Sequence, residues 1–420
     1  MTHPVPHEVV IFVLLVVLAL AVAFIARRLR VTYTLALVLT GLAIGALHLL
    51  PTVQLNANLV LFVFLPALLF DGAWNIETAA LRADWLAILL LAVPGLLVSL
   101  VVVAAVVHWG AGLPLLAALL LGAIVSPTDP IAVLALLRRL GMPERLCSII
   151  EGESLFNDGV GAAAFDLVLG ALLLSLHQDG ALAGLPATLV VLKGLWLLLG
   201  GLALGGAVGF AVSHVVRVVD DPLLETTVTF SVAYGAYILA TALGTSGLLS
   251  VVGAGLVLGS YGRRIGMAEP TRAVVDTVWQ FTGYLANSLL FLLVGIEIGS
   301  ASLLDELPTI AWAVLGVLLG RAVVVYTLLP LHDAIKRWRG AHISGDRPHA
   351  FGWLPVPPLW RPLILFSGLR GALSLALVIS LPPSVPLRQP LTLAVYGVVL
   401  VTLVGQTIGL RLVIPRWPRV

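Results

Sequence analysis

Long apolar runs recur along almost the whole chain, and they limit its possible folds more than any other feature. Residues 9–26 and 85–107 contain no charged side chain at all. A helix that crosses the hydrocarbon of a bilayer needs about 20 mostly apolar residues. Charged residues make up only 10% of the chain, whereas soluble domains carry about 25%. The sequence therefore excludes a soluble globule and predicts an all-α polytopic membrane protein; the short alternating segments of a β-barrel are not seen.

About thirteen membrane-spanning helices are expected along the chain. The weakest division lies between 226–244 and 246–260, where only the stretch from Gly244 to Gly247 marks a turn. The expected segments, numbered in chain order, are 8–26, 33–50, 57–75, 84–107, 114–137, 149–176, 187–216, 226–244, 246–260, 277–299, 308–330, 362–381 and 391–413.

The basic residues predict how these segments are oriented. With the N-terminus outside, most of the 23 Lys and Arg residues fall on cytoplasmic sides, and only Lys193 and Arg388 fall outside. Because positive charge resists translocation, we expect the N-terminus outside and the C-terminus inside. Residues 1–420 are expected to form one transmembrane domain with no soluble regulatory domain. The longest loop, at 331–361, is basic and Pro-rich, and its role stays open.

The fifth and twelfth segments are interrupted in their middles. The fifth contains Ser-Pro-Thr-Asp-Pro at 126–130, and its two prolines remove backbone donors and break the helix. The twelfth contains Ser-Gly-Leu-Arg-Gly at 367–371. Backbone groups freed at bilayer depth need protein or water partners. Interrupted helices at matching positions of two halves are a sequence indication of a transporter's binding site.

The spacing of these interruptions predicts an inverted repeat. The two broken segments lie seven apart in order, and an odd offset places them in opposite orientations. We therefore expect two halves, at 8–176 and 226–413, joined by a linker helix at 187–216. Where the broken helices cross, Asp129 could neutralise one pair of half-helix ends and Arg370 the other. A proline kink with an interfacial arginine is the alternative.

The sixth segment carries a dense polar motif, Glu-Gly-Glu-Ser-Leu-Phe-Asn-Asp-Gly at 151–159. Ser154 and Asp158 share one helical face, and Glu153 and Asn157 share the adjacent one. A carboxylate removed from water binds a proton more readily than an exposed one. It can hold a proton or a small cation, but not both at once. Competition for this group, combined with exposure to alternate sides, would give proton-coupled exchange.

Hard oxygen ligands near Asp158 would suit Na⁺ or Li⁺. We predict a Na⁺ site formed by Asp158, Ser154 and an oxygen of Thr128, with a structural carboxylate as the alternative. Glu153 is expected to pair with Arg321 of the eleventh segment.

Two further carboxylates, Asp71 and Asp166, lie within predicted membrane segments. Asp71 either extends the acidic path or lies at the interface, and Asp166 either lines an outward passage or hydrogen-bonds a neighbour. No nucleotide-binding loop and no HExxH-type or GxSxG-type motif is present, so neither an enzyme nor a cofactor is expected.

Four motifs together carry a resemblance to a known family. They are EGESLFNDGVG at 151–161, SPTDP at 126–130, LPALLFDG at 65–72 and GLRG at 368–371. This combination resembles the monovalent cation:proton antiporter superfamily, in its NhaP-type sodium/proton exchanger branch. The resemblance covers about residues 25–410. It implies a thirteen-helix homodimer in a lipid bilayer, with a core domain that moves like an elevator.

The resemblance also implies roles for particular residues. The aspartate matching Asp158 binds the cation and the proton, Ser154, Thr128 and Asp129 complete or support the site, and Asn157 holds the crossover. The family's structural glutamate and arginine match Glu153 and Arg321.

The residue before the central aspartate bears on stoichiometry. Asn157 stands there, which resembles the electroneutral branch and implies one cation per proton. Asp71 departs from the branch, which usually has glutamate at that position. A K⁺/H⁺ antiporter on the same scaffold is the first alternative, and a passive cation channel is a weaker one. A bacterial inner membrane, a role in pH homeostasis and no nucleic-acid partner are expected.

Overall fold

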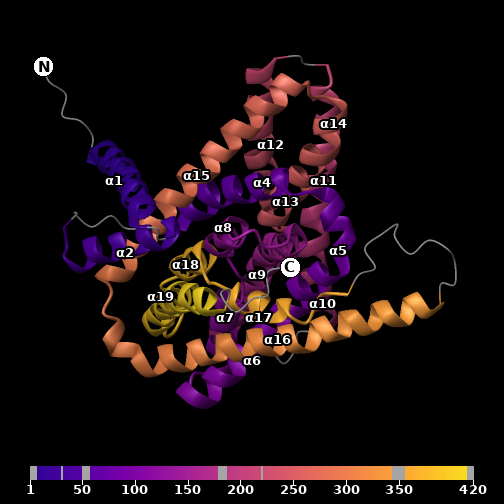
Figure 1. Ribbon diagram of the computed structural model, residues 1–420. Coiled ribbons are helices and arrows are strands. Elements are labelled where there is room, and N and C mark those ends of the chain that lie inside the picture. Colours follow the sequence, from indigo (N-terminus) through magenta and orange to yellow (C-terminus); the bar gives the residue numbers. More distant parts are fainter. Residues whose placement is uncertain are drawn as a thin grey trace, which may run out of the picture.

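The computed structural model describes residues 7–29, 32–49, 57–177, 187–218, 221–342 and 355–413. Within these ranges every regular element is helical (Figure 1). The α-helices are α1 (His7–Leu29), α2 (Tyr33–Ala46), α3 (Ala57–Leu59), α4 (Leu65–Asn75), α5 (Thr78–Leu90), α6 (Leu96–Ala111), α7 (Leu115–Val125), α8 (Ile131–Arg139), α9 (Glu144–His177), α10 (Ala187–Leu195), α11 (Gly201–Val216), α12 (Pro222–Ala242), α13 (Gly247–Val257), α14 (Arg263–Ile265), α15 (Glu269–Ser300), α16 (Leu307–His342), α17 (Trp360–Phe366), α18 (Ala372–Ile379) and α19 (Arg388–Val413).

Short 3₁₀ or π-helical turns join several of these α-helices into longer continuous helices. A 3₁₀ turn at Leu303–Glu306 precedes α16. Single π-helical turns lie at Val60–Phe64, Leu91–Gly95, Trp196–Gly200 and Leu258–Gly262. The turn before α6 contains Pro94, which has no backbone N–H to give to the preceding turn, so the wider turn at this position has a covalent cause.

Nine helical stretches in the described part of the chain are long and apolar enough to cross a bilayer. They fall on the first, third, fourth, sixth, seventh, eighth, tenth, eleventh and thirteenth predicted segments. The remaining four predicted segments fall on the shorter helices α2, α7–α8, α13–α14 and α17–α18. The all-α membrane architecture is therefore confirmed. The total of thirteen crossings, the inverted repeat and the orientation of the termini stay predictions.

The weakest predicted division, between the eighth and ninth segments, is a helix boundary in the structure. Helix α12 ends at Ala242, and Gly244 adopts a left-handed φ of 67° that suits glycine. Ser246 then caps α13 by accepting a hydrogen bond of 3.3 Å from the backbone N–H of Leu249.

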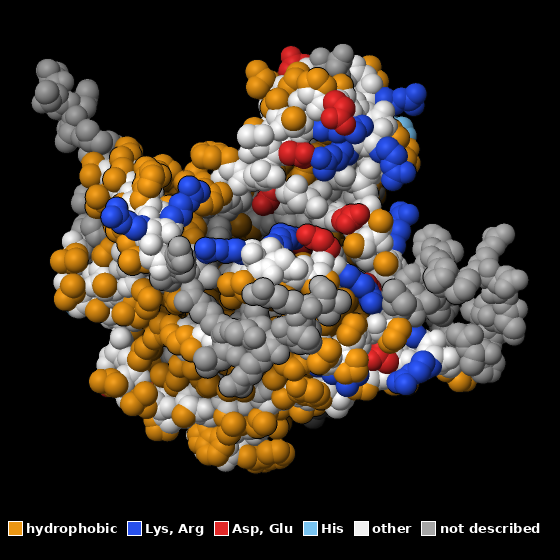
Figure 2. Space-filling model, in the orientation of Figure 1, with side chains coloured by type: hydrophobic (Ala, Val, Ile, Leu, Met, Phe, Trp, Pro, Cys, Tyr) orange, Lys and Arg blue, Asp and Glu red, His pale blue; other side chains and the backbone are white. Residues whose placement is uncertain are grey.

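The long helices α15 and α16 frame the molecule from opposite sides, and α8, α9, α18 and α19 lie between them (Figure 1). Charged side chains gather across the middle and upper part of the face in Figure 2, whereas hydrophobic side chains dominate its lower and left margins. Helix α9, which carries the acidic motif, packs against α5, α7 and α13. This central position brings the motif close to both interrupted segments.

Candidate functional site

Two interrupted segments meet at the centre of the molecule. Helix α7 ends at Val125 and α8 begins at Ile131, because the intervening stretch contains two prolines. Helix α17 ends at Phe366 and α18 begins at Ala372, across the glycine-rich stretch. The backbone N–H of Asp129 donates a hydrogen bond of 2.9 Å to the carbonyl of Leu369, so the two breaks are joined directly.

Asp129 faces the N-terminal ends of two half-helices. Its carboxylate accepts a hydrogen bond of 3.2 Å from the N–H of Ile131, the first residue of α8. It also accepts one from Ala372, the first residue of α18. The close approach requires Gly371, since a Cβ there would collide with this carboxylate. Exposed helix N-termini carry partial positive charge, so the charge of Asp129 is already engaged by the protein.

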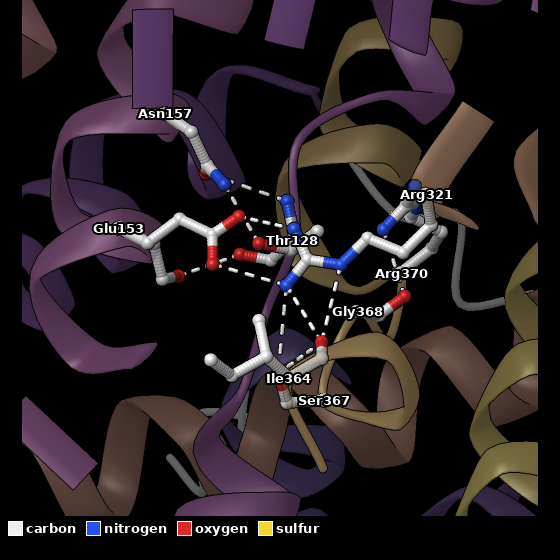
Figure 3. Close-up of polar contacts among 9 residues, drawn as sticks. Thr128, Glu153, Asn157, Arg321, Ile364, Ser367, Gly368 and Arg370 are labelled. Atoms are coloured by element: carbon white, nitrogen blue, oxygen red, sulfur yellow. Dashed lines mark hydrogen bonds and ion pairs between the residues drawn. The ribbon is translucent and has the colours of Figure 1, made fainter. Parts of the chain in front are cut away.

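Glu153 and Arg321 form a buried ion pair (Figure 3). Their side chains are only 2% and 4% exposed. Arg321 Nη2 donates to Glu153 Oε2 at 3.0 Å and to the carbonyl of Ile364 at 2.9 Å, and its Nε reaches the same carbonyl at 3.2 Å. Arg321 thus also satisfies a carbonyl near the end of α17, where the break leaves acceptors without helical partners.

Arg370 is fully enclosed beside this pair. It is 1% exposed, and its Nη1 donates to the carbonyl of Gly368 at 2.7 Å (Figure 3). Its backbone N–H is 3.3 Å from the hydroxyl oxygen of Thr402 in α19. The guanidinium therefore has one backbone acceptor in the α17–α18 break, while its buried Nε has no hydrogen-bond partner in the described structure. Arg370 lines a small cavity together with Thr128, Glu153 and Arg321. Cations are favourable near helix C-terminal carbonyls.

Three side chains fasten α9 to the α7–α8 break. Ser154 Oγ donates to the carbonyl of Thr128 at 2.5 Å. Asn157 Nδ2 donates to Thr128 Oγ1 at 2.7 Å, and the N–H of Thr128 donates back to Asn157 Oδ1 at 3.3 Å. The hydroxyl of Thr128 is therefore used by Asn157 (Figure 3), and its carbonyl is held by Ser154.

A cavity of about 110 Å³ opens beside these contacts. Its wall includes Asp158, Asp129, Ser154 and Thr128, and no Lys, Arg or His among the described residues lines it. Asp158 is half-buried and has no hydrogen-bond or ion-pair partner within the described residues. The structure thus gathers four of the predicted site residues around one acidic cavity, with Asn157 directly behind Thr128.

Asp71 does not line this cavity. Asn75 Nδ2 donates to its carboxylate at 2.7 Å, and the carboxylate lies against Gly283 of α15. The neighbouring residue Gly72 lines the cavity instead. Asp71 therefore stands beside the cavity and not in its wall.

Two polar cavity-lining residues are not among the predicted site residues, Glu151 and Ser374. Glu151 belongs to the acidic motif, and Arg138 donates to it at 2.6 Å. Ser374 is the third residue of α18, and its buried hydroxyl has no hydrogen-bond partner in the structure. A search for hydroxyl residues just after a predicted helix break could have found it.

Asp166 and the basic loop lie away from the cavity. Asp166 is exposed, and Lys193 of α10 is near it. The middle of the loop, at 343–354, lies outside the described residues. Its described end is anchored, because Asp333 of α16 accepts hydrogen bonds from the N–H of Val356 at 3.0 Å and from Arg361 at 3.2 Å.

The oxygen atoms around the cavity suit a cation that does not require a cluster of charged ligands. In the described part of the chain, no group of three or more His, Cys, Asp or Glu side chains is placed to hold a metal ion. The cavity instead mixes carboxylate, hydroxyl and carbonyl oxygens, which are ligands for hard cations. Its polar groups can therefore hold a proton or a partly hydrated small cation.

Comparisons with known proteins place the chain in one family. A family model described as the transmembrane sodium/hydrogen exchanger matches residues 13–414. The Na⁺/H⁺ antiporter ApNhaP of Aphanothece halophytica is 37% identical over 387 residues, which are 92% of this chain and 70% of that protein. The Na⁺/H⁺ antiporter NhaP of Pseudomonas aeruginosa is 35% identical over 363 residues, covering 84% of this chain and 80% of its own.

A solved structure shares the fold. The sodium proton antiporter MjNhaP1 from Methanocaldococcus jannaschii superposes with a TM-score of 0.69 at 19% sequence identity. The match covers 97% of both chains. The arrangement of helices around the two breaks is therefore that of a known membrane-protein fold.

Proposed function

This chain belongs to the transmembrane sodium/hydrogen exchanger family, and from that premise we propose that it is a Na⁺/H⁺ antiporter. The names of its relatives support sodium as the cation. The multi-pass architecture and the bacterial relatives are consistent with a plasma membrane. A role in pH homeostasis follows from the proposed reaction.

The observation that carries the proposal is an unpaired carboxylate in an acidic cavity. Asp158 has no ion-pair partner within the described residues, although it lies inside the stretch Glu144–Leu176 of α9, which is long and apolar enough to cross a bilayer. An uncompensated charge there is costly, so the group favours a bound proton or a bound cation over the empty charged state. Each ligand displaces the other, which couples cation movement to proton movement.

The ligands of the cation would come from two elements. Asp158 and Ser154 come from α9, and the carbonyl of Thr128 comes from the α7–α8 break. Asp129 supports the site from behind, since its carboxylate is bound to two helix N-termini. Asp71 lies beside the cavity wall, where its charge would attract a cation. Glu151 lies in the wall, but its charge is paired with Arg138.

We extend the proposal to one cation per proton. Asn157 is neutral and is used in hydrogen bonds with Thr128, and Glu153 is neutralised by Arg321. Of the two carboxylates at 153 and 158 of the motif, Asp158 is then the one that is free to exchange a proton for a cation. Exchange of one Na⁺ or Li⁺ for one H⁺ leaves the net charge of the site unchanged.

We further propose that alternating access follows an elevator-like movement and that the protein is a homodimer. Contacts that join α7–α8, α9, α16 and α17–α18 around the cavity support a moving unit made of these helices. A unit that keeps its cation ligands fixed can change the exposed side only by moving as a body against other helices.

The test is exchange by purified protein in liposomes with an acidic interior and a pH-sensitive dye, with the membrane potential clamped. We expect alkalinisation on addition of Na⁺ or Li⁺, and none with Asp158→Asn. Asp166→Asn is the matched control, because this exposed aspartate lies outside the cavity. A K⁺ response of equal size would favour the potassium alternative, and cation current without proton movement would favour a channel. Exchange retained by Asp158→Asn would refute the proposed role of this residue.

A further inference from the structure

The hydroxyl of Ser374 is buried without a partner. The residue is 1% exposed, and its Oγ has no hydrogen-bond partner in the described structure. Ser99 and Ser250 share this property, whereas several other helical serines return their hydroxyl to a carbonyl in the preceding turn. Ser213 donates to Gly209 at 2.7 Å, and Ser380 donates to Leu377 at 2.7 Å. Leaving such a hydroxyl unsatisfied in a protein interior is costly, so Ser374 calls for an explanation.

The helix break explains why the usual partner is missing. Helix α18 begins at Ala372, so the residues three and four positions before Ser374 are Gly371 and Arg370, outside the helix. Gly371 has φ −143° and ψ −140°, far from helical values. Neither the carbonyl of Gly371 nor that of Arg370 accepts a hydrogen bond from Ser374 Oγ in the described structure.

Ser374 also belongs to the residues that line the cavity containing Asp158. The wall from α18 and the break before it consists of Gly371, Ala372, Leu373 and Ser374. Ser154 and Thr128 stand in the same wall, contributed by α9 and the other break. Ser374 thus brings a buried, unpartnered hydroxyl to the cavity wall from the C-terminal part of the chain.

We propose that Ser374 Oγ is a ligand of the transported cation. This inference rests on the proposed function and deepens it, because it adds an oxygen from α18 to those of α9 and the α7–α8 break. A hydroxyl oxygen is a hard, neutral ligand, so it strengthens cation binding without adding charge to the site. Because it replaces part of the hydration shell of the ion, it acts on affinity and on the choice among Li⁺, Na⁺ and K⁺.

The test compares exchange kinetics of Ser374→Ala with those of the unmodified protein in the same liposomes. We expect the apparent KM for Na⁺ to rise about five- to tenfold, the effect of losing one polar contact to a charged ligand. The maximal rate should stay within about twofold, because no proton-carrying group is removed. Ser374→Cys, which keeps the size but offers soft sulfur, should raise the KM as well. Ser374→Thr keeps a hydroxyl and should restore the original KM.

Two matched controls separate a ligand from a structural serine. Ser380→Ala removes a hydroxyl from the end of the same helix that is bonded to its own backbone. Ser250→Ala removes another buried, unpartnered hydroxyl, in α13, from a residue outside this cavity wall. Both variants should leave the KM for Na⁺ unchanged. A fall in maximal rate with unchanged KM in Ser374→Ala, or no change at all, would overturn the inference.

A binding measurement keeps the inference separate from the proposed function. Na⁺ should raise the melting temperature of the purified protein, and Ser374→Ala should need about five- to tenfold more Na⁺ for the same shift. If the unmodified protein catalyses no exchange, the proposed function fails, yet this Na⁺ shift still decides the role of Ser374. A Na⁺ shift that is equal in both proteins, or absent from both, would overturn it.

Discussion

Arg321 meets two needs of the interior with one side chain. It neutralises Glu153 and satisfies the carbonyl of Ile364, where α17 stops short. Both partners of the pair are almost fully buried. Removing one member of such a pair leaves an uncompensated charge, which destabilises a protein by about 3–5 kcal/mol. The role of this pair is therefore to hold the crossing helices together.

Arg321→Ala should accordingly lower the melting temperature strongly, and Glu153→Ala added to it should recover part of the loss. Differential scanning fluorimetry on the detergent-solubilised protein measures both. Glu269→Ala is the control, because Glu269 is 92% exposed and 3.6 Å from Arg272, so its loss should leave stability unchanged. A stable Arg321→Ala protein with weaker Na⁺ binding would instead make Arg321 part of the cation site.

Helix α11 packs on α13 with its backbone in close contact. The stripe of Gly201, Gly205 and Gly209 faces α13, as is typical of closely packed membrane helices. A Cβ at Gly205 would overlap the carbonyl of Ser250. For a Cβ on the adjacent Gly206, the nearest atom would be a methyl carbon of Val257, 3.9 Å away. Two neighbouring glycines therefore differ sharply in the space around them.

This difference predicts opposite outcomes for the same substitution. Gly205→Ala should lower the melting temperature, because the two helices must move apart to admit the methyl group. Gly206→Ala should be neutral or slightly stabilising, since alanine favours a helix by up to about 1 kcal/mol over glycine. Equal melting temperatures for the two variants would contradict the close packing of α11 on α13.

On the scale of the whole molecule, the contacts around the two breaks define a unit that can be tested for movement. Leu249 of α13 packs against Gly159 of α9, at the edge of that unit. Val106 of α6 packs against Gly316 of α16. The Cβ of Val106 is 3.4 Å from the place that a Cβ on Gly316 would occupy. The first contact must change if α9 slides past α13, and the second need not change.

Cysteine pairs at these positions should therefore respond differently to oxidation, in a background with Cys147→Ala. Crosslinking Gly159→Cys to Leu249→Cys should stop exchange, and reduction should restore it. Crosslinking Val106→Cys to Gly316→Cys should leave exchange largely intact. The test measures exchange in liposomes before and after oxidation, and mass spectrometry reports how much of each pair is crosslinked. Continued exchange by a fully crosslinked first pair would exclude sliding of α9 past α13.

The sequence predicted those features of the whole molecule that have a local chemical cause. The two prolines at 127 and 130 and the two glycines at 368 and 371 lie close together in the sequence and weaken a helix locally, and both breaks lie where they were expected. Long apolar runs likewise predict membrane helices, and the nine crossing stretches follow them.

The composition of the cavity wall was harder to predict, because it depends on how distant segments face one another. Nothing in the local sequence says that the Thr128 hydroxyl turns to Asn157, or that Asp71 stands beside the wall while Gly72 lines it. Ser374 lies within an ordinary apolar stretch, and only its position after a break reveals an unsatisfied hydroxyl.

The engagement of Asp129 by two helix N-termini has a consequence for kinetics. If that carboxylate keeps its backbone partners throughout the transport cycle, Asp158 is the one group of the site that takes up a proton, and H⁺ is a simple competitor of Na⁺. At pH values low enough for Asp158 to be mostly protonated, the apparent KM for Na⁺ should then rise tenfold for each unit by which the pH falls. The dependence on H⁺ should have a Hill coefficient of one. A steeper slope would mean that Asp129 leaves its helix ends and takes up a second proton.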